Sequence, residues 1–351
     1  MAGPLGANPE YVALITDRCN KATLAEVKFE QLTWGRVLDD VSEAKLTVPA
    51  GQCDKLGDVR AWRHELHVIR NNDEVWCGPV VTPVPCRSGM TLVAQDPFGW
   101  LGVRVVHNTL CYSTDCGGAP APGVLLAQRI VRDALEPDDP CLLEWVQAIG
   151  AGTPQERTYL ANSGYSLAAL QDLAKGGCDF TAIGRRMILM QEGYELAQLP
   201  MLTCDHFAGD VCTSDDGFGA ASRAVVTGKA ADGTTVVTGT AGGVDDYLGL
   251  VEVLLNDDSV RTAAAATTQA QGLLSPIAPL LVQPPQGSGL TPDAPVGIND
   301  LVPGVMVGVT LSCTGRDATA NLRLTKLDVT VDASGETVQP LLQPTTVTPD
   351  A

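Results

Sequence analysis

The feature that most constrains this chain is a strict alternation of side chains that follows a polar turn at Asp39-Asp40. One side of this segment carries Ser42, Ala44, Leu46 and Val48, and the other side carries Glu43, Lys45 and Thr47. Alternation with a period of two is typical of a strand that buries one face. The sequence therefore predicts a chain organised around a β-sheet.

A second signature, Val75-Trp76-Cys77-Gly78-Pro79-Val80, lies in the returning arm of a predicted hairpin. A turn at Asn71-Asn72-Asp73 separates a strand over 65–70 from one over 74–84. Further strands are expected between clusters of Gly, Pro, Asn and Asp, at 11–16, 25–32, 42–49, 91–96 and 102–107. This even spacing favours a small antiparallel barrel or sandwich.

Helical periodicity replaces the alternation after residue 112. The apolar residues that share one helical face are Val124, Ala127, Val131 and Leu135. A second helix is expected over 167–175, with Ser166 as its N-cap. Residues 113–177 are therefore predicted to form a helical or mixed insertion.

Strands are expected again in the C-terminal half, at 180–190, 202–205, 223–228, 234–239, 248–255, 305–313 and 320–332. An Ala-rich helix over 260–274, capped by Ser259, interrupts them, and prolines within 276–303 predict an extended connection. In the last strand the apolar positions change from even to odd numbers, which predicts a bulge near Thr325-Lys326.

The expected fold class is mainly β with α+β additions. Four parts are predicted: a first antiparallel β-barrel over 1–112, the insertion over 113–177, a second β-barrel with the Ala-rich helix over 178–343, and a mobile C-terminal tail over 344–351.

Charge and cysteine content limit the possible functions. The formal net charge of -18 argues against a protein that neutralises nucleic-acid phosphates. The 11 cysteines are odd in number and scattered, so we expect reduced thiols and folding in a cytosol. We expect no signal peptide, because no basic residue precedes an apolar run at the N-terminus, and no apolar stretch long enough to span a membrane.

Three segments, in this order, resemble the baseplate-hub or minor tail proteins of long-tailed (siphovirus) bacteriophages, especially phages of actinobacteria. They are Trp34–Pro49 together with Trp76-Cys77-Gly78-Pro79, the helix-to-strand passage Leu173–Arg185, and Leu301–Val307 before the last strands. The resemblance implies that both barrels are related to tail-tube subunits. It also implies a homotrimeric ring at the tail tip of the virion, made in the host cytoplasm, that continues the tail tube.

In such a ring the pore passes the tape-measure protein and then DNA, without specific binding of the DNA. The implied partners are further copies of the chain, the distal tail protein, the tape-measure protein and other tail-tip proteins. No catalytic residue belongs to the resemblance. We therefore expect no catalytic, cofactor-binding or metal-binding residues, and no enzyme activity.

Several local patterns resemble metal or nucleotide sites, but each is better explained by a structural role. His64-Glu65-Leu66-His67 lacks the spacing of a zinc protease motif, and a strand would direct its two histidines to opposite faces. Cys204-Asp205-His206 with Cys212, and Cys111 with Cys116, lack the paired cysteines of structural zinc sites. Gly217–Ser222 and Gly228-Lys229 lack the remaining residues of nucleotide-binding loops. We expect turns and buried thiols at these places.

Two other functions remain open. A tail-associated cell-wall hydrolase would need two carboxylates facing one cleft, whereas Asp138-Asp139, Asp215-Asp216, Asp245-Asp246 and Asp257-Asp258 are expected to be solvated turns. A receptor-binding or carbohydrate-binding tip protein would expose aromatic residues, whereas Trp34, Trp62, Trp76, Trp100 and Trp145 are expected mainly in the core. The sequence also leaves open a hexameric ring like that of distal tail proteins.

Overall fold

The computed structural model describes residues 4–20, 22–113, 116–209, 212–214, 221–230, 234–246, 249–257, 260, 262–274, 281–283, 289–312 and 318–344. The chain divides into two compact units. Unit 1 comprises Met1–Val211 and Pro284–Gln343, and unit 2 comprises Cys212–Gln283 and Pro344–Ala351. No helix in the described part of the chain is both long and apolar enough to cross a membrane.

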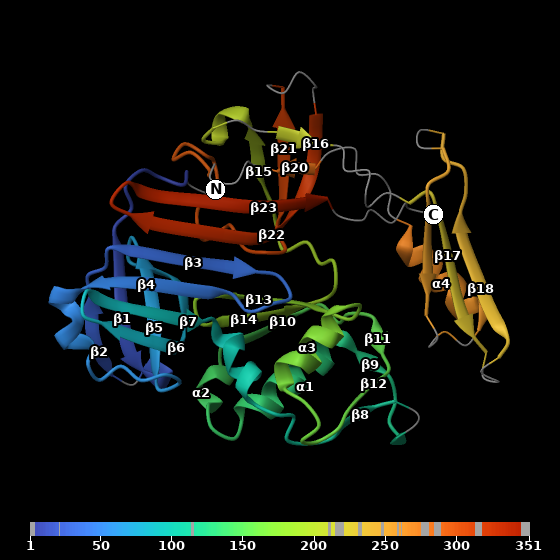
Figure 1. Ribbon diagram of the computed structural model, residues 1–351, viewed down its shortest axis with the longest axis horizontal. Helices are drawn as coiled ribbons and strands as arrows, with labels where there is room; N and C mark the ends of the chain where they lie inside the picture. Colours follow the sequence, from blue (N-terminus) through green and yellow to red (C-terminus); the bar gives the residue numbers. More distant parts are fainter. Residues whose placement is uncertain are drawn as a thin grey trace. The chain divides into compact units, whose positions relative to one another are not determined.

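Unit 1 is built on an 11-stranded sheet, so the protein is mainly β as expected (Figure 1). Its strands are β1 (Tyr11–Asp17), β2 (Thr23–Val27), β3 (Gln31–Val37), β4 (Glu43–Pro49), β5 (His64–Arg70), β6 (Asp73–Cys86), β7 (Gly89–Gln95), β15 (Gln198–Thr203), β21 (Met306–Leu311), β22 (Ala318–Asp332) and β23 (Gly335–Pro344). Their order is β15-β21-β22-β3-β4-β7-β6-β5-β1-β2, and β23 pairs with β22. The pair β15–β21 is parallel.

The alternating segment forms β4, and its apolar residues Ala44, Leu46 and Val48 are each at most 1% exposed. The hairpin signature forms β5 and β6. The first half of β6 pairs with β5 and its second half with β7, with a register shift between Val80 and Thr82. Both local predictions are therefore confirmed. Strand β6 connects β5 and β7 within the sheet, because it pairs with each of them along a different half.

Strand β22 joins two sets of strands that are far apart in sequence. Its first part pairs with β21, and its last part, Lys326–Val331, pairs with β3. The buried residues change parity where the partner changes, because Leu322 and Leu324 are buried before Thr325, and Leu327 and Val329 after it. The change of parity read from the sequence is therefore present in the burial of the strand, and the bulge near Thr325-Lys326 stays a prediction. The extra strand β23 was not expected.

The segment between β7 and β15 forms helices and short strands (Figure 1). Their buried side chains form a second hydrophobic core. Its elements are the 3-10 helix η3 (Pro97–Val103), the helices α1 (Gly123–Leu135), α2 (Pro140–Leu143) and α3 (Ser166–Ala174), and the strands β8 (Leu110–Tyr112), β9 (Ala121–Pro122), β10 (Val146–Ile149), β11 (Pro154–Gln155), β12 (Arg157–Tyr159), β13 (Asp179–Ile183) and β14 (Arg186–Met190). Strands β10, β14 and β13 form a three-stranded sheet in that order, and β10 is one of its two edge strands. Short 3-10 helices elsewhere in unit 1 are η1 (Arg18–Asn20), η2 (Ala50–Leu56) and η5 (Cys204–His206).

Three local predictions in this segment are wrong. The strand expected over 102–107 is largely replaced by η3 and irregular chain, because Pro97-Phe98 begin a 3-10 turn capped by Asp96. The single strand expected over 180–190 is the hairpin β13–β14, since Gly184 adopts a positive φ of 53° and turns the chain. Ser166 is the first helical residue of α3 and Tyr165 is its N-cap.

Unit 2 contains β16 (Cys212–Ser214), β17 (Arg223–Lys229), β18 (Val236–Gly242), β19 (Glu252–Asn256), β20 (Leu281–Gln283) and α4 (Ala263–Leu273). Strands β18, β17 and β19 form a sheet, and β16 pairs with β20. The Ala-rich helix α4 packs its buried Ala266 and Ala270 on that sheet. Gly239 permits this close approach, because a Cβ there would lie 2.2 Å from the Thr267 nitrogen. Thr262, not Ser259, caps the helix, and Ser259 lies outside the described residues.

Candidate functional site

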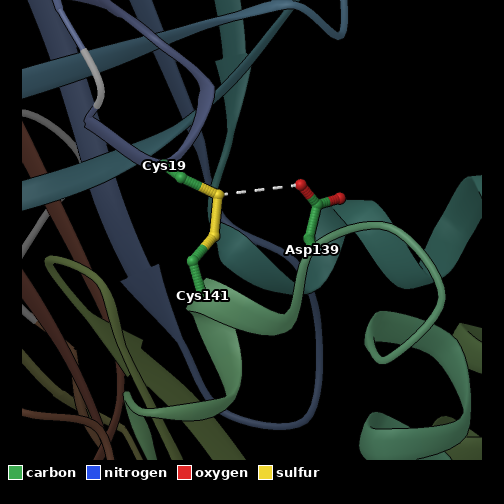
Figure 2. Close-up of side chains that lie close together, drawn as sticks. All are labelled: Cys19, Asp139 and Cys141. Atoms are coloured by element: carbon green, nitrogen blue, oxygen red, sulfur yellow. Dashed lines mark hydrogen bonds between the residues drawn. A yellow bond between two sulfur atoms is a disulfide. The ribbon is translucent and has the colours of Figure 1, made fainter.

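A disulfide joins the N-terminal strands to the helical segment of unit 1. Cys19 lies in η1, between β1 and β2, and Cys141 lies in α2, 122 residues later. Figure 2 shows the carboxylate of Asp139 beside this bond, with Cys19 Sγ 3.8 Å from Asp139 Oδ1. Because a disulfide sulfur has no hydrogen to donate, this is a contact between the two groups. We use the name clamp for the cluster formed by Cys19, Cys141, Asp139, Arg18 and Arg104.

Two arginines neutralise Asp139, whose side chain is fully buried. Arg18 Nε lies 3.0 Å from Asp139 Oδ1, and Arg104 donates to Asp139 Oδ2. Both guanidinium groups also lie against the Trp100 ring, 5.5 and 5.3 Å from its centroid. A buried carboxylate requires such pairing, because desolvation of an isolated charge is costly. The clamp therefore holds the helical segment against the N-terminal strands.

The structure corrects two predictions here. Asp138-Asp139 was expected as a solvated turn, but only Asp138 is exposed, because the fold places Asp139 between two arginines. The cysteines were expected to be reduced, but the chain forms the disulfides Cys19–Cys141 and Cys111–Cys116, and Cys204 is also disulfide-bonded. The physical reason is proximity that sequence spacing hides, since the Cα atoms of Cys19 and Cys141 are 6.1 Å apart.

Cysteine pairing also affects the candidate metal ligands. Cys19, Asp139 and Cys141 form a cluster of potential ligand atoms, but the two sulfurs are bonded to each other and offer no thiolate. The same holds for Cys111 and Cys116. The unpaired cysteines among the described residues are Cys53, Cys77, Cys86 and Cys178.

A cavity of about 400 Å³ lies beside the clamp and is lined by Asp17, Arg18, Ala61, Trp62 and Arg63. Trp62 has a positive φ of 62°, which is a strained backbone for a bulky residue. Its ring packs 5.3 Å from that of Trp100. The polar groups of the cavity largely have partners among neighbouring residues. Arg18 pairs with Asp139, and Asp17 lies 3.4 Å from His64 Nε2.

A second polar cluster is buried where β5 and β6 meet the β13–β14 hairpin. Glu65, His67 and Cys77 are each at most 3% exposed, and their ligand atoms lie within 4.8 Å of one another. Arg185 lies 3.3 Å from Glu65 Oε2 and 3.2 Å from His67 Nε2. Glu74 Oε2 lies 2.7 Å from the other ring nitrogen, Nδ1.

This cluster is a network in which Arg185 supplies the positive charge. Burial, together with the charges of Glu65 and Glu74, raises the pKa of the Cys77 thiol well above its usual value, so the thiol stays protonated at neutral pH. His64 belongs to a different environment, because its Nδ1 accepts from the Arg60 N–H at 2.9 Å. The structure thus brings Glu65 and His67 together and directs His64 elsewhere.

The remaining predicted residues do not converge on a further site within the described residues. His206 Nδ1 accepts from the Thr203 N–H at 3.0 Å, and Gly228-Lys229 end strand β17 instead of beginning a phosphate loop. Asp245 pairs with Gly249 in a turn. The predictions for Asp215-Asp216, 217–220 and Asp258, and for the side chain of Cys212, lie outside the described residues.

The tryptophans differ in exposure. Trp34, Trp76 and Trp100 are at most 3% exposed, Trp62 is partly buried, and Trp145 is 43% exposed.

Arg18 and Arg104 were missed by the sequence reasoning, although a signal existed. Cys19 follows the positively charged Arg18, and Cys141 follows the acidic pair Asp138-Asp139 after one proline. The two cysteines therefore lie near charges of opposite sign.

This chain is similar to known proteins in its fold but not detectably in its sequence. The sequence matches no protein-family model and no curated protein sequence. The fold is similar to a 43 kDa tail protein of prophage MuSo2 from Shewanella oneidensis, with TM-score 0.60, 12% identity, and coverage of 95% of this chain and 97% of that one. It is similar to a tail protein from Neisseria meningitidis, with TM-score 0.61, 14% identity, and coverage of 97% and 99%.

A third similar structure is the prophage tail protein gp18 from Listeria monocytogenes, with TM-score 0.56, 10% identity, and coverage of 94% of both chains. These likenesses span nearly the whole of each chain, in three different bacteria. At such low identity they establish architecture and not activity. The chain therefore has the fold of prophage tail proteins.

Proposed function

We propose that this chain is a structural subunit of a phage-type tail tip, a baseplate hub of the siphovirus kind. In this proposal it forms a homotrimeric ring in the virion that continues the tail tube and passes the tape-measure protein and DNA. The observation that carries the proposal is the fold likeness to three prophage tail proteins over 94–97% of this chain.

The arrangement of strands supports this role. In the main sheet β22 pairs with β3 on one side and connects it to β21 and β15, which come from the C-terminal half of the chain. We propose that residues 1–112 and residues 178–343 each form a tube-like barrel in the assembled ring. Two barrels in each of three subunits would match a sixfold tube, and a closed ring would cover strand edges that otherwise pair indiscriminately. The insertion over 113–177 and the tail over 344–351 complete the proposed organisation.

The net charge of -18 supports passage of DNA without binding. Carboxylates facing the lumen would repel the phosphate backbone of DNA. The proposed neighbours are the distal tail protein above and other tail-tip proteins below, and the proposed role includes no catalysis.

Imaging of purified tails tests the proposal. We expect an antibody against this chain to lie on the tail axis, and a reconstruction of the tip to show three copies around an acidic pore. A single copy, a position on peripheral fibres, or a basic pore would contradict it. A sixfold ring would identify a distal tail role, and release of fragments from purified host cell wall would favour the hydrolase alternative.

A further inference from the structure

An apolar notch with a cationic rim lies on the surface of the helical segment of unit 1. Its volume is about 260 Å³, and it is lined by Leu125, Gln128, Arg129, Val131, Arg132, Leu143 and Val146. Leu125 is 39% exposed and Trp145, between Leu143 and Val146, is 43% exposed. The notch lining contains two arginines and no carboxylate, although acidic residues outnumber basic ones 41 to 23 in this chain. An occupant should therefore provide an apolar side chain and a carboxylate.

The notch borders a strand edge. Val146, in its lining, begins β10, which pairs with β14 on one side and with no other described strand. The edge residues Gln147 and Ala148 are exposed. Edges of this kind are templates for an added strand, and an exposed Trp and Arg beside an apolar pocket are typical anchors of an interface. The occupant should therefore be extended chain.

Strand β2 of the same protein has these properties. It is the last strand of the main sheet and pairs only with β1 among the described strands. Ala25 and Val27 face inward, whereas Leu24, 39% exposed, and Glu26 share the outward face. Leu24 matches the apolar notch, and Glu26 matches its arginines. Arg132 is available to Glu26, since its contact with Glu136 is a surface pair at 3.9 Å.

We propose that β2 of one copy adds to the edge of β10 in the next copy, with Leu24 in the notch and Glu26 beside Arg132 and Arg129. This inference rests on the proposed ring and names its contact. Different surfaces of the two copies meet, so the contact is head-to-tail and repeats around the assembly.

The clamp would give such a contact the same geometry in every subunit. Head-to-tail contacts form rings or open filaments according to the rotation between copies. Cys19 lies just before β2, and Cys141 just before β10, so the disulfide of Figure 2 limits movement between the two edges within one subunit. A constrained angle between donor and acceptor edges gives each copy the same rotation relative to the next.

Crosslinking between two separately made variants tests the contact. Ala22, the residue just before β2, and Ala148, in β10, are both exposed. All variants carry Cys86→Ser, because Cys86 is an exposed free thiol. We expect a mixture of Ala22→Cys and Ala148→Cys chains to form disulfide-linked dimers at least tenfold more than a mixture in which Ala333→Cys, at an exposed turn, replaces Ala22→Cys. Equal yields in the two mixtures would overturn the proposal.

A charge exchange gives an independent test in assembled tails. Arg132→Glu and Glu26→Arg should each reduce incorporation of this chain at least fivefold, and the double variant should restore it. Arg87→Glu, at an exposed turn, should leave incorporation unchanged. Loss in both single variants without recovery in the double variant would contradict this pairing. If tails show the ring while crosslinking fails, the contact is wrong and the proposed function stands; a single copy on the axis would contradict the proposed function itself.

Discussion

Arg70 and Glu336 form a two-pronged ion pair across 266 residues of sequence, with Nε–Oε1 and Nη2–Oε2 distances of 2.8 Å. Each side chain is 6% exposed. The pair connects β5 to β23, and the Tyr11 hydroxyl donates to the same carboxylate. A late strand is thus held to an early one by charge as well as by packing.

Removal of one partner of this ion pair should destabilise the folded protein. We expect Glu336→Gln to lower the free energy of unfolding by about 3–5 kcal/mol, because it leaves the Arg70 charge buried without its counter-charge. Denaturant titration followed by tryptophan fluorescence reports this unit, since all five tryptophans lie in it. Glu136→Gln removes the exposed pair with Arg132 and should cost less than about 1 kcal/mol. Equal losses would show that the buried pair has no special role.

The disulfide of the clamp should contribute to stability. We expect Cys141→Ser to lower the free energy of unfolding by about 2–4 kcal/mol, because the bond closes a long loop in the unfolded chain. Cys86→Ser, which removes an exposed unpaired thiol, should have little effect. Thiol titration of the denatured, unreduced protein checks the pairing directly, and 11 reactive thiols would contradict it.

Asp39 should make unit 1 less stable as pH rises. Burial and the nearby Asp179 raise its pKa from 3.8 to about 7. Below about pH 4 the carboxyl is protonated in both folded and unfolded chains; between pH 4 and 7 only the unfolded chain ionises, so stability falls over this window. Asp39→Asn retains a residue that tolerates the positive φ of 62° and removes the titration.

We expect Asp39→Asn to be more stable than the unmodified protein by on the order of 2–4 kcal/mol at pH 8, and similar to it at pH 4. Asp40→Asn, an exposed neighbour, should show no such difference. Parallel curves of unfolding free energy against pH for the unmodified and Asp39→Asn proteins would contradict the assignment.

Gly78 in the Trp76-Cys77-Gly78-Pro79 signature should not tolerate a side chain. A Cβ at this position would lie 1.7 Å from the Gln95 carbonyl oxygen, where β6 crosses to β7. We expect Gly78→Ala to lower the melting temperature by about 10 °C or more, or to abolish folding, because backbone must move. Gly164→Ala, where nothing lies within 4 Å, should change it by no more than about 3 °C.

Local patterns in the sequence predicted the elements whose partners are close in sequence. The alternation in β4, the β5–β6 hairpin and the apolar face of α1 all depend on neighbouring residues, and all were found. The parity change in β22 was also readable, because burial on one side of a strand leaves a periodic trace. Such signals contain no information on which distant strand is the partner.

Long-range relationships were therefore missed. The Cys19–Cys141 bond, the pairing of β22 with β3, and the burial of Asp139 all arise when distant segments meet. The edge strand β10 was missed for a related reason, since four residues are too few for a periodic signal. The candidate site could be suspected only from charged residues adjacent to cysteines.

The pairing of β22 with β3 has a consequence for synthesis on the ribosome. The paired residues Val37 and Lys326 are roughly 290 residues apart, so β3 emerges long before the strand that will cover it. At a translation rate of about 5–20 residues per second, that side of β3 waits on the order of 15–60 s. During this interval nascent chains on neighbouring ribosomes present the same uncovered edge to one another. Production of this subunit should therefore be sensitive to expression rate and temperature, and to chaperones that shield extended chain until translation is complete.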